Sequence, residues 1–208
     1  MKNIDRIDNL IDIMTSMSSE ENNTALHETL QSEKDRVSLM LSQIVLTNAL
    51  ENLIENWEHF YPIDKASIYE FVVEWINAQN KEFDNLEVEE ITLRRFDFVS
   101  QIKEKIQSAY NENIDKTTAV ELYYETSLNQ VNELKYALNQ FITGVLNAAN
   151  NALTDVQLMG CPMILHETSL RTALSFSKKV IDKYGSEAPE IAKNIYNELL
   201  NIFTKNTL

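Results

Sequence analysis

The amino-acid sequence predicts an all-α protein, and three observations carry that prediction. Only 3 glycines and 3 prolines occur among 208 residues, too few for the tight turns that a sheet protein needs. Apolar residues recur at spacings of three and four along most of the chain, as on one face of an α-helix. No segment shows the apolar and polar alternation of a half-buried strand. We therefore expect a single helical bundle of about seven helices, with two long central helices.

The first long helix is predicted from about Thr24 to Phe60. No charged residue occurs between Arg36 and Glu51, and the apolar residues in that stretch point in nearly every direction around a helix. Such a pattern is typical of a helix that is surrounded by protein. The stretch contains polar residues and is shorter than the roughly 18 to 20 apolar residues that a bilayer needs, so we expect no membrane span.

The second long helix is predicted to begin at Asp115. Its apolar residues keep three-and-four spacing for about five heptads, and the buried face is wider than the seam of a two-stranded coiled coil. Leu128 belongs to a flanking row of this face. Gly144 and several alanines beside it would let another helix approach closely. We expect this helix to pack against the first one.

Shorter helices complete the prediction, and their ends follow from capping residues. A first amphipathic helix is expected over residues 3–17. Proline and glycine mark several ends, and short polar side chains mark several starts. The expected signals are a break at Tyr61-Pro62, an N-cap at Asp64, a capping box formed by Asp84 and Glu87, Pro162 in a first turn, a stop at Gly185 and an N-cap at Ser186.

The fourth predicted helix, which follows the capping box, has a mainly apolar buried face. Phe96 and Val99 are expected beside this face. No linker is long or polar enough to demand two domains, so residues 1–208 are predicted to form one domain. A sub-division near residues 160–162, before a C-terminal helical hairpin, is the alternative.

Charge and cysteine content limit the possible surroundings and partners. The formal net charge is −14, and residues 51–125 hold seventeen acidic and seven basic residues. A surface for direct nucleic-acid binding needs clustered Lys and Arg, so that function is disfavoured. Cys161 is the single cysteine, which excludes an intramolecular disulfide framework. Residues 1–14 carry three aspartates and do not resemble a signal peptide.

These observations favour a cytoplasmic protein. The 22 asparagines and 19 isoleucines suggest an AT-rich coding genome, such as that of a phage or a low-GC bacterium, and a phage protein would be located in a virion.

Three histidines invite a metal-site hypothesis, but their spacing does not support one. His59 has Glu55 one helical turn away, whereas His27 and His166 each lie in a Leu-His-Glu-Thr tetrapeptide. A transition-metal site needs several donors that converge on one point, and no His-x-x-x-His pair occurs. We interpret these residues as ordinary surface or interhelical histidines and expect neither a metal nor a cofactor.

A pair of acidic motifs suggests an enzymatic alternative. Glu87-x-x-Glu90 is followed, 21 residues later, by Glu112-x-x-Asp115. This arrangement resembles the paired acidic motifs of the all-α nucleoside triphosphate pyrophosphohydrolases, in which carboxylates on two facing helices hold magnesium against a triphosphate. In that family the second pair lies inside a helix, whereas here it lies in a predicted helix junction. The resemblance covers these four residues alone.

Cys161 and His166 form a second candidate for catalysis, because a thiolate is favoured at a helix N-terminus. The sequence offers no third group to orient the histidine and no oxyanion feature, so we interpret Cys161 as a structural or incidental cysteine. The sequence therefore favours a non-enzymatic interaction or structural protein that acts by helix packing, in a homo-oligomer or a larger assembly. An acidic inhibitor that presents residues 51–125 to a basic, nucleic-acid-binding protein is the alternative. The magnesium-dependent pyrophosphohydrolase comes third.

Overall fold

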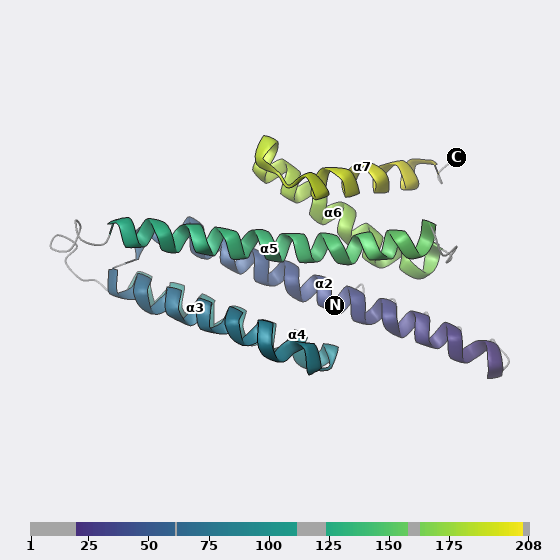
Figure 1. Cartoon of the computed structure of the whole chain (residues 1–208), viewed down its shortest axis with the longest axis horizontal. Helices are drawn as coiled ribbons and strands as arrows, with labels where there is room; N and C mark the ends of the chain where they lie inside the picture. Colours follow the sequence, from purple (N-terminus) through teal and green to yellow (C-terminus); the bar gives the residue numbers. More distant parts are fainter. Residues whose placement is uncertain (1–19, 61, 112–123, 158–162, 206–208) are drawn as a thin grey trace. The chain divides into compact units, whose positions relative to one another are not determined.

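The structure is a computed structural model that describes residues 20–60, 62–111, 124–157 and 163–205. Within these ranges it contains six α-helices and four short 3-10 helices, and no strand (Figure 1). The predicted all-α fold is therefore confirmed. The α-helices are α2 (Glu20–Glu55), α3 (Pro62–Glu82), α4 (Val88–Asn111), α5 (Tyr124–Gln157), α6 (Glu167–Tyr184) and α7 (Glu190–Lys205).

The described helices divide into two compact units. Unit 1 contains α2 as far as Leu41, α5 from Thr143 onward, α6 and α7. Unit 2 contains the chain from Ser42 to Ile142, and thus the remainder of the two long helices together with α3 and α4. That residues 1–208 form one domain stays a prediction. The alternative sub-division near residues 160–162 lies outside the described residues, as do the helix over residues 3–17 and the starts expected at Asp115 and Pro162.

Both predicted long helices are present, with 36 residues in α2 and 34 in the described part of α5, but α2 begins at Glu20, four residues before the expected start at Thr24. The α-helical part of α2 ends at Glu55 rather than Phe60, and a 3-10 helix, Trp57–His59, follows it. Trp57 and Phe60 are both buried, and their rings meet edge to face with centroids 6.1 Å apart. The tighter turn therefore ends the helix while keeping two large aromatic side chains in the core.

Two predicted caps are wrong by a few residues. Asp64 lies in the first turn of α3, because that helix begins at Pro62, whose missing amide N–H is tolerated there. Asp84 lies in a 3-10 helix, Phe83–Asn85, so it does not open α4. The backbone amide of Ile91 donates to the carbonyl of Glu87 at 3.0 Å, which places Glu87 at the N-cap position.

The C-terminal hairpin is confirmed, although its turn differs in detail. Gly185 has a φ of 56°, a conformation that favours glycine, and its amide donates to the carbonyl of Ile181 to close α6. A 3-10 helix, Gly185–Glu187, then separates α6 from α7, so Ser186 does not cap α7 as predicted. The two helices contact each other, and Figure 1 shows them joined by a short turn.

Two residues assigned to buried faces are exposed. Phe96 on α4 is 42% exposed and Leu128 on α5 is 55% exposed, whereas Val99, one turn from Phe96, is buried. Part of the apolar face of α4, and part of that of α5, is therefore left exposed by the residues that the structure describes. Periodicity identified the helices correctly but overestimated how far around each helix the core extends.

The segment His27–Glu55 of α2 is long and apolar enough to cross a membrane by length and composition. The core helix of a soluble protein meets the same criterion, and 56% of the apolar window is buried inside the structure.

Candidate functional site

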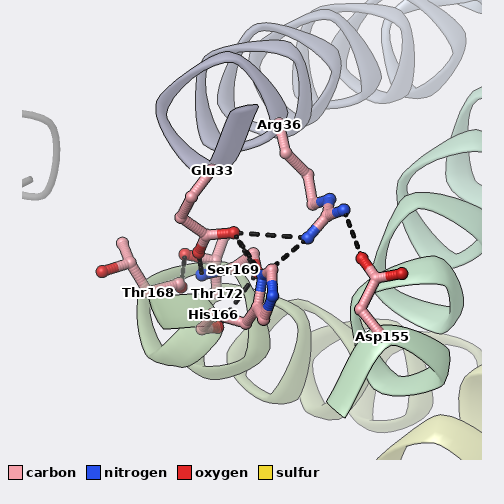
Figure 2. A network of polar contacts seen from close by, with 7 residues as sticks. All are labelled: Glu33, Arg36, Asp155, His166, Thr168, Ser169 and Thr172. Carbon is pink, nitrogen blue, oxygen red and sulfur yellow. Dashed lines mark hydrogen bonds and ion pairs between the residues drawn. The ribbon is translucent and has the colours of Figure 1, made fainter. Parts of the chain in front are cut away.

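A network of polar side chains lies in the core of unit 1 (Figure 2). Glu33 and Arg36 come from α2, and Asp155 comes from the last turns of α5. Ser169 comes from the first turn of α6, and His166 ends the 3-10 helix Met163–His166 that precedes it. Glu33, His166 and Ser169 are buried. Because isolated buried charges are costly, such a group is stable only when its members satisfy one another.

Glu33 acts as an N-terminal cap for α6, although it lies on another helix. His166 occupies the N-cap position of α6 and makes no capping hydrogen bond with its own side chain. The Ser169 backbone amide donates instead to Glu33 Oε1 at 3.0 Å. The carboxylate also places negative charge at the positive end of the helix dipole. One side chain thus satisfies an orphan donor and fixes where α6 begins against α2.

Arg36 joins the members of the network. Its Nη2 donates to Asp155 Oδ2 at 2.7 Å, and its Nη1 lies 2.9 Å from His166 Nδ1 and 3.4 Å from Glu33 Oε2. Glu33 and Arg36 are three residues apart, so both side chains leave the same face of α2. The guanidinium therefore connects α2, α5 and the start of α6 through charge-assisted hydrogen bonds.

The arrangement around His166 selects one tautomer of its ring. A guanidinium can only donate, so the 2.9 Å contact from Arg36 Nη1 assigns the acceptor role to Nδ1. A hydrogen on Nδ1, donated to Glu33 Oε2 at 3.2 Å, would instead set two donors 2.9 Å apart. The ring hydrogen of neutral His166 then lies on Nε2, which is buried and has no hydrogen-bond partner within the described chain. Glu33 Oε2 also lies 3.2 Å from Nδ1, but with Nδ1 as an acceptor this oxygen takes no hydrogen from the ring and accepts instead from Arg36 Nη1, 3.4 Å away.

The chemistry of this network is that of a structural clamp. The Ser169 hydroxyl has one hydrogen to donate, and both oxygens within reach, Glu33 Oε2 at 3.2 Å and the His166 carbonyl at 3.0 Å, can accept it. No contact joins that hydroxyl to a ring nitrogen of His166, so Ser169 and His166 do not form a nucleophile and base pair. Every hydrogen bond described here holds one helix to another or to itself.

Unit 2 carries a groove between α3 and α4, which lie side by side (Figure 1). Two cavities, of about 400 and 320 Å³, lie along the groove and share Gln101. The larger is lined by the start of α3 and the second half of α4, including Asp64, Glu104 and Lys105. We call the whole feature the α3–α4 groove.

The smaller cavity of the α3–α4 groove has aromatic walls. Trp75 stacks on Phe98 with ring centroids 4.0 Å apart and an interplanar angle of 9°, and it meets Phe83 edge to face at 5.9 Å. The Arg94 guanidinium carbon lies 6.0 Å from the centre of the Phe83 ring. Arg94 is also hydrogen bonded to Glu90 and Glu82, and these two bonds raise the pKa of its guanidinium.

Two further polar contacts lie in unit 2. Arg95 donates from Nη1 to Ser42 Oγ at 3.0 Å, and burial lowers the pKa of its guanidinium to about 10, so it stays charged at neutral pH. The Tyr69 hydroxyl donates to Glu133, which joins α3 to α5. That hydrogen bond, followed by burial and by the carboxylate charge, raises the pKa of Tyr69 to about 12.

The candidate site residues named from the sequence lie in different surroundings in the structure. His27 and His59 are exposed, whereas His166 is buried in the network. Glu87 and Glu90 are exposed at the start of α4; Glu112, Asp115 and Cys161 lie outside the described residues. Across the part of the chain that the structure describes, no three His, Cys, Asp or Glu side chains are grouped so that they could hold a metal ion.

Sequence reasoning missed Glu33, Arg36, Asp155 and Ser169. One signal was available, because Leu30, Val37 and Met40 are buried on α2 and Glu33 falls at the helical spacing between them. A charged residue at a position where the period demands an apolar one indicates a buried partner elsewhere in the chain. The partners could not be identified, because Asp155 is 119 residues from Arg36 in sequence and Ser169 is 136 residues from Glu33.

Comparison with known proteins adds no functional information. No protein-family model matches this chain, and no curated protein or solved structure is significantly similar to it.

Proposed function

We propose that this protein is a non-enzymatic helical interaction protein that acts by packing its helices against a second copy of itself or against other subunits of an assembly. The observation that carries the proposal is a pair of exposed apolar side chains on α4. Leu93 is 57% exposed and Phe96 is 42% exposed. They are three residues apart, so they lie on one face of the helix.

Single exposed apolar residues are common on soluble proteins, but neighbouring ones on one helix face suit a helix-packing interface. The same unit also exposes Leu128 and Tyr136 on α5. The buried polar groups of unit 1, in contrast, are used to hold helices together, as the hydrogen bonds of Glu33 and Arg36 illustrate. Binding through apolar helix faces therefore fits the described side chains better than catalysis does.

Light scattering coupled to size-exclusion chromatography tests the proposal over a wide concentration range. We expect the wild-type protein to form a species larger than one chain, and the variant Leu93→Gln/Phe96→Gln to dissociate it. The matched control is Ile164→Gln/Leu200→Gln, which changes two exposed apolar residues of unit 1. A strictly monomeric wild-type protein would count against self-association, and equal effects of the two double variants would count against the α4 face.

A second candidate is an acidic protein that binds a basic partner, and a specific observation favours it. The segment from α3 through α4, residues 62–111, contains ten acidic and six basic residues. One of the six bases, Arg95, is largely buried and contributes little to the surface. This candidate expects salt-sensitive binding to a basic protein and no direct binding to nucleic acid.

A further inference from the structure

We propose that the α3–α4 groove is a docking site for an arginine-bearing segment of a basic partner protein. This inference rests on the acidic-partner candidate and specifies both the site and the side chain that it receives. Four lines of observation carry it: the shape of the groove, its charges, its unsatisfied acceptors and its aromatic walls.

The shape of the groove suits an extended segment rather than a compact ligand. The two cavities meet at Gln101 and run along the length of the helix pair. Each has a volume near the lower end of the range that protein pockets use for small groups, about 300 to 1,000 Å³. Two side chains of one segment could therefore enter the two cavities.

The charges of the groove favour a cation. Asp64 and Glu104 line one cavity, and Glu82 and Asp97 line the other; each cavity has one base, Lys105 or Arg94. The excess of carboxylates repels phosphate and other anions. A divalent metal is disfavoured as well, because no suitable group of donors converges within the described residues.

Each cavity also holds a hydrogen-bond acceptor without a donor. Asp64 lines the larger cavity and Gln79 the smaller one, and one oxygen of each side chain, Asp64 Oδ2 and Gln79 Oε1, is shielded from solvent and has no partner among the described residues. Buried acceptors without donors are unfavourable, and a ligand that supplies N–H groups removes this cost if the two side chains turn their free oxygens toward the cavities. A guanidinium supplies five such groups in a planar fork.

The aromatic walls favour arginine over lysine. The α3–α4 groove already holds one guanidinium of its own against an aromatic wall, because Arg94 lies 6.0 Å from the centre of the Phe83 ring. Arg94 combines that position with hydrogen bonds to two carboxylates, which is the mode expected for an incoming guanidinium. Arg94 would then compete with the ligand for the same groups.

Binding of short probe peptides to the full-length protein tests the inference. The probes are blocked peptides of equal length in which Ala alternates with Arg, with Lys or with Gln. Trp75 lines the groove and reports binding by its fluorescence, whereas the other tryptophan, Trp57, is 1% exposed. Calorimetry gives the affinity independently. We expect the Arg peptide to bind more tightly than the Lys peptide and the Gln peptide not to bind.

Two pairs of variants separate the groove from general electrostatics. Asp97→Asn/Glu104→Gln removes one carboxylate from each cavity and should weaken the Arg peptide roughly fivefold or more. Glu70→Gln/Glu74→Gln removes the same charge from exposed positions on α3 outside the groove and should change the affinity less than about twofold. Arg94→Gln should tighten binding by removing the competing guanidinium, and Lys81→Gln, with the same charge change at an exposed position, should not.

The possible outcomes are distinct. Equal weakening by both double variants, or binding that leaves the fluorescence of Trp75 unchanged, would overturn the groove and leave the acidic-partner candidate standing. Absence of binding by every cationic probe at low salt would overturn both. Selective weakening by the groove variants, with tightening by Arg94→Gln, would support the inference.

Discussion

Replacement of Glu33 by alanine is the most informative perturbation of this protein, because one carboxylate caps α6 and joins the network of unit 1. The variant leaves the buried Ser169 amide without its acceptor, which costs about 1–3 kcal/mol. It also removes a negative charge from the N-terminus of α6, worth roughly 0.3–1 kcal/mol. Arg36 loses its contact to Glu33 but keeps the shorter hydrogen bond to Asp155 at 2.7 Å, so the free-energy cost at Arg36 is small. We expect a decrease of about 1–4 kcal/mol in the free energy of unfolding.

Urea unfolding followed by circular dichroism measures this change, and the midpoint of thermal unfolding should fall by roughly 3–15 °C. Glu33→Gln should cost about half as much, because its amide oxygen can still accept from Ser169 N. The control is Glu28→Ala, an exposed glutamate on the same helix, which should change the free energy of unfolding by less than about 0.5 kcal/mol.

Amide hydrogen exchange locates the effect. The Ser169 amide should exchange faster in Glu33→Ala, whereas amides of α3 and α4 in unit 2 should be unaffected. If Glu33→Ala is no more destabilising than Glu28→Ala, or if Ser169 exchanges as in the wild type, then Glu33 does not cap α6 and our reasoning about the network is wrong.

Two further predictions concern protons. Tyr69 should titrate at about 12 in the folded protein, measured by phenolate absorbance against Tyr69→Phe, and Glu133→Gln should lower that midpoint toward 10. The folded-state pKa is raised, so the contribution of this tyrosine to stability is complete below pH 10 and is lost as the pH rises through about 12; an unchanged midpoint in Glu133→Gln would exclude Glu133 as the cause. For His166, long-range proton–nitrogen spectra should show the ring hydrogen on Nε2 in the wild type, and Arg36→Met should move it to Nδ1, facing Glu33. A hydrogen on Nδ1 in the wild type would contradict the assigned roles.

Local features of the fold could be predicted from residues close together in sequence. The three-and-four spacing of apolar residues identified the long helices, and Gly185 identified the end of α6, because each depends on the backbone geometry of one or two turns. The starts of α3, α4 and α7 were predicted less well. A 3-10 turn before α4, and another before α7, moved the start by several residues, and sequence patterns distinguish these turns poorly from α-helix.

The candidate site residues show the same difference between what nearby residues predict and what only the folded chain decides. The sequence drew attention to His166 as a candidate. It could not distinguish this buried histidine from the exposed His27, because both occur in the same tetrapeptide. The groove was likewise invisible, since it needs Asp64 and Glu104 brought to one cavity by two antiparallel helices. Phe96 was placed beside a buried face, and the structure exposes it.

By itself, the sequence determined that this protein is all-α, acidic and built on two long helices, since helical periodicity and net charge are properties of the chain and need no partner. Tertiary structure alone decided that Glu33 caps α6, that Arg36 reaches Asp155, and that a groove with aromatic walls forms between α3 and α4. The physical reason is the distance along the chain over which each interaction is set. Apolar spacing is set within a few residues, whereas a buried charge is tolerated only through partners that folding brings from distant parts of the chain.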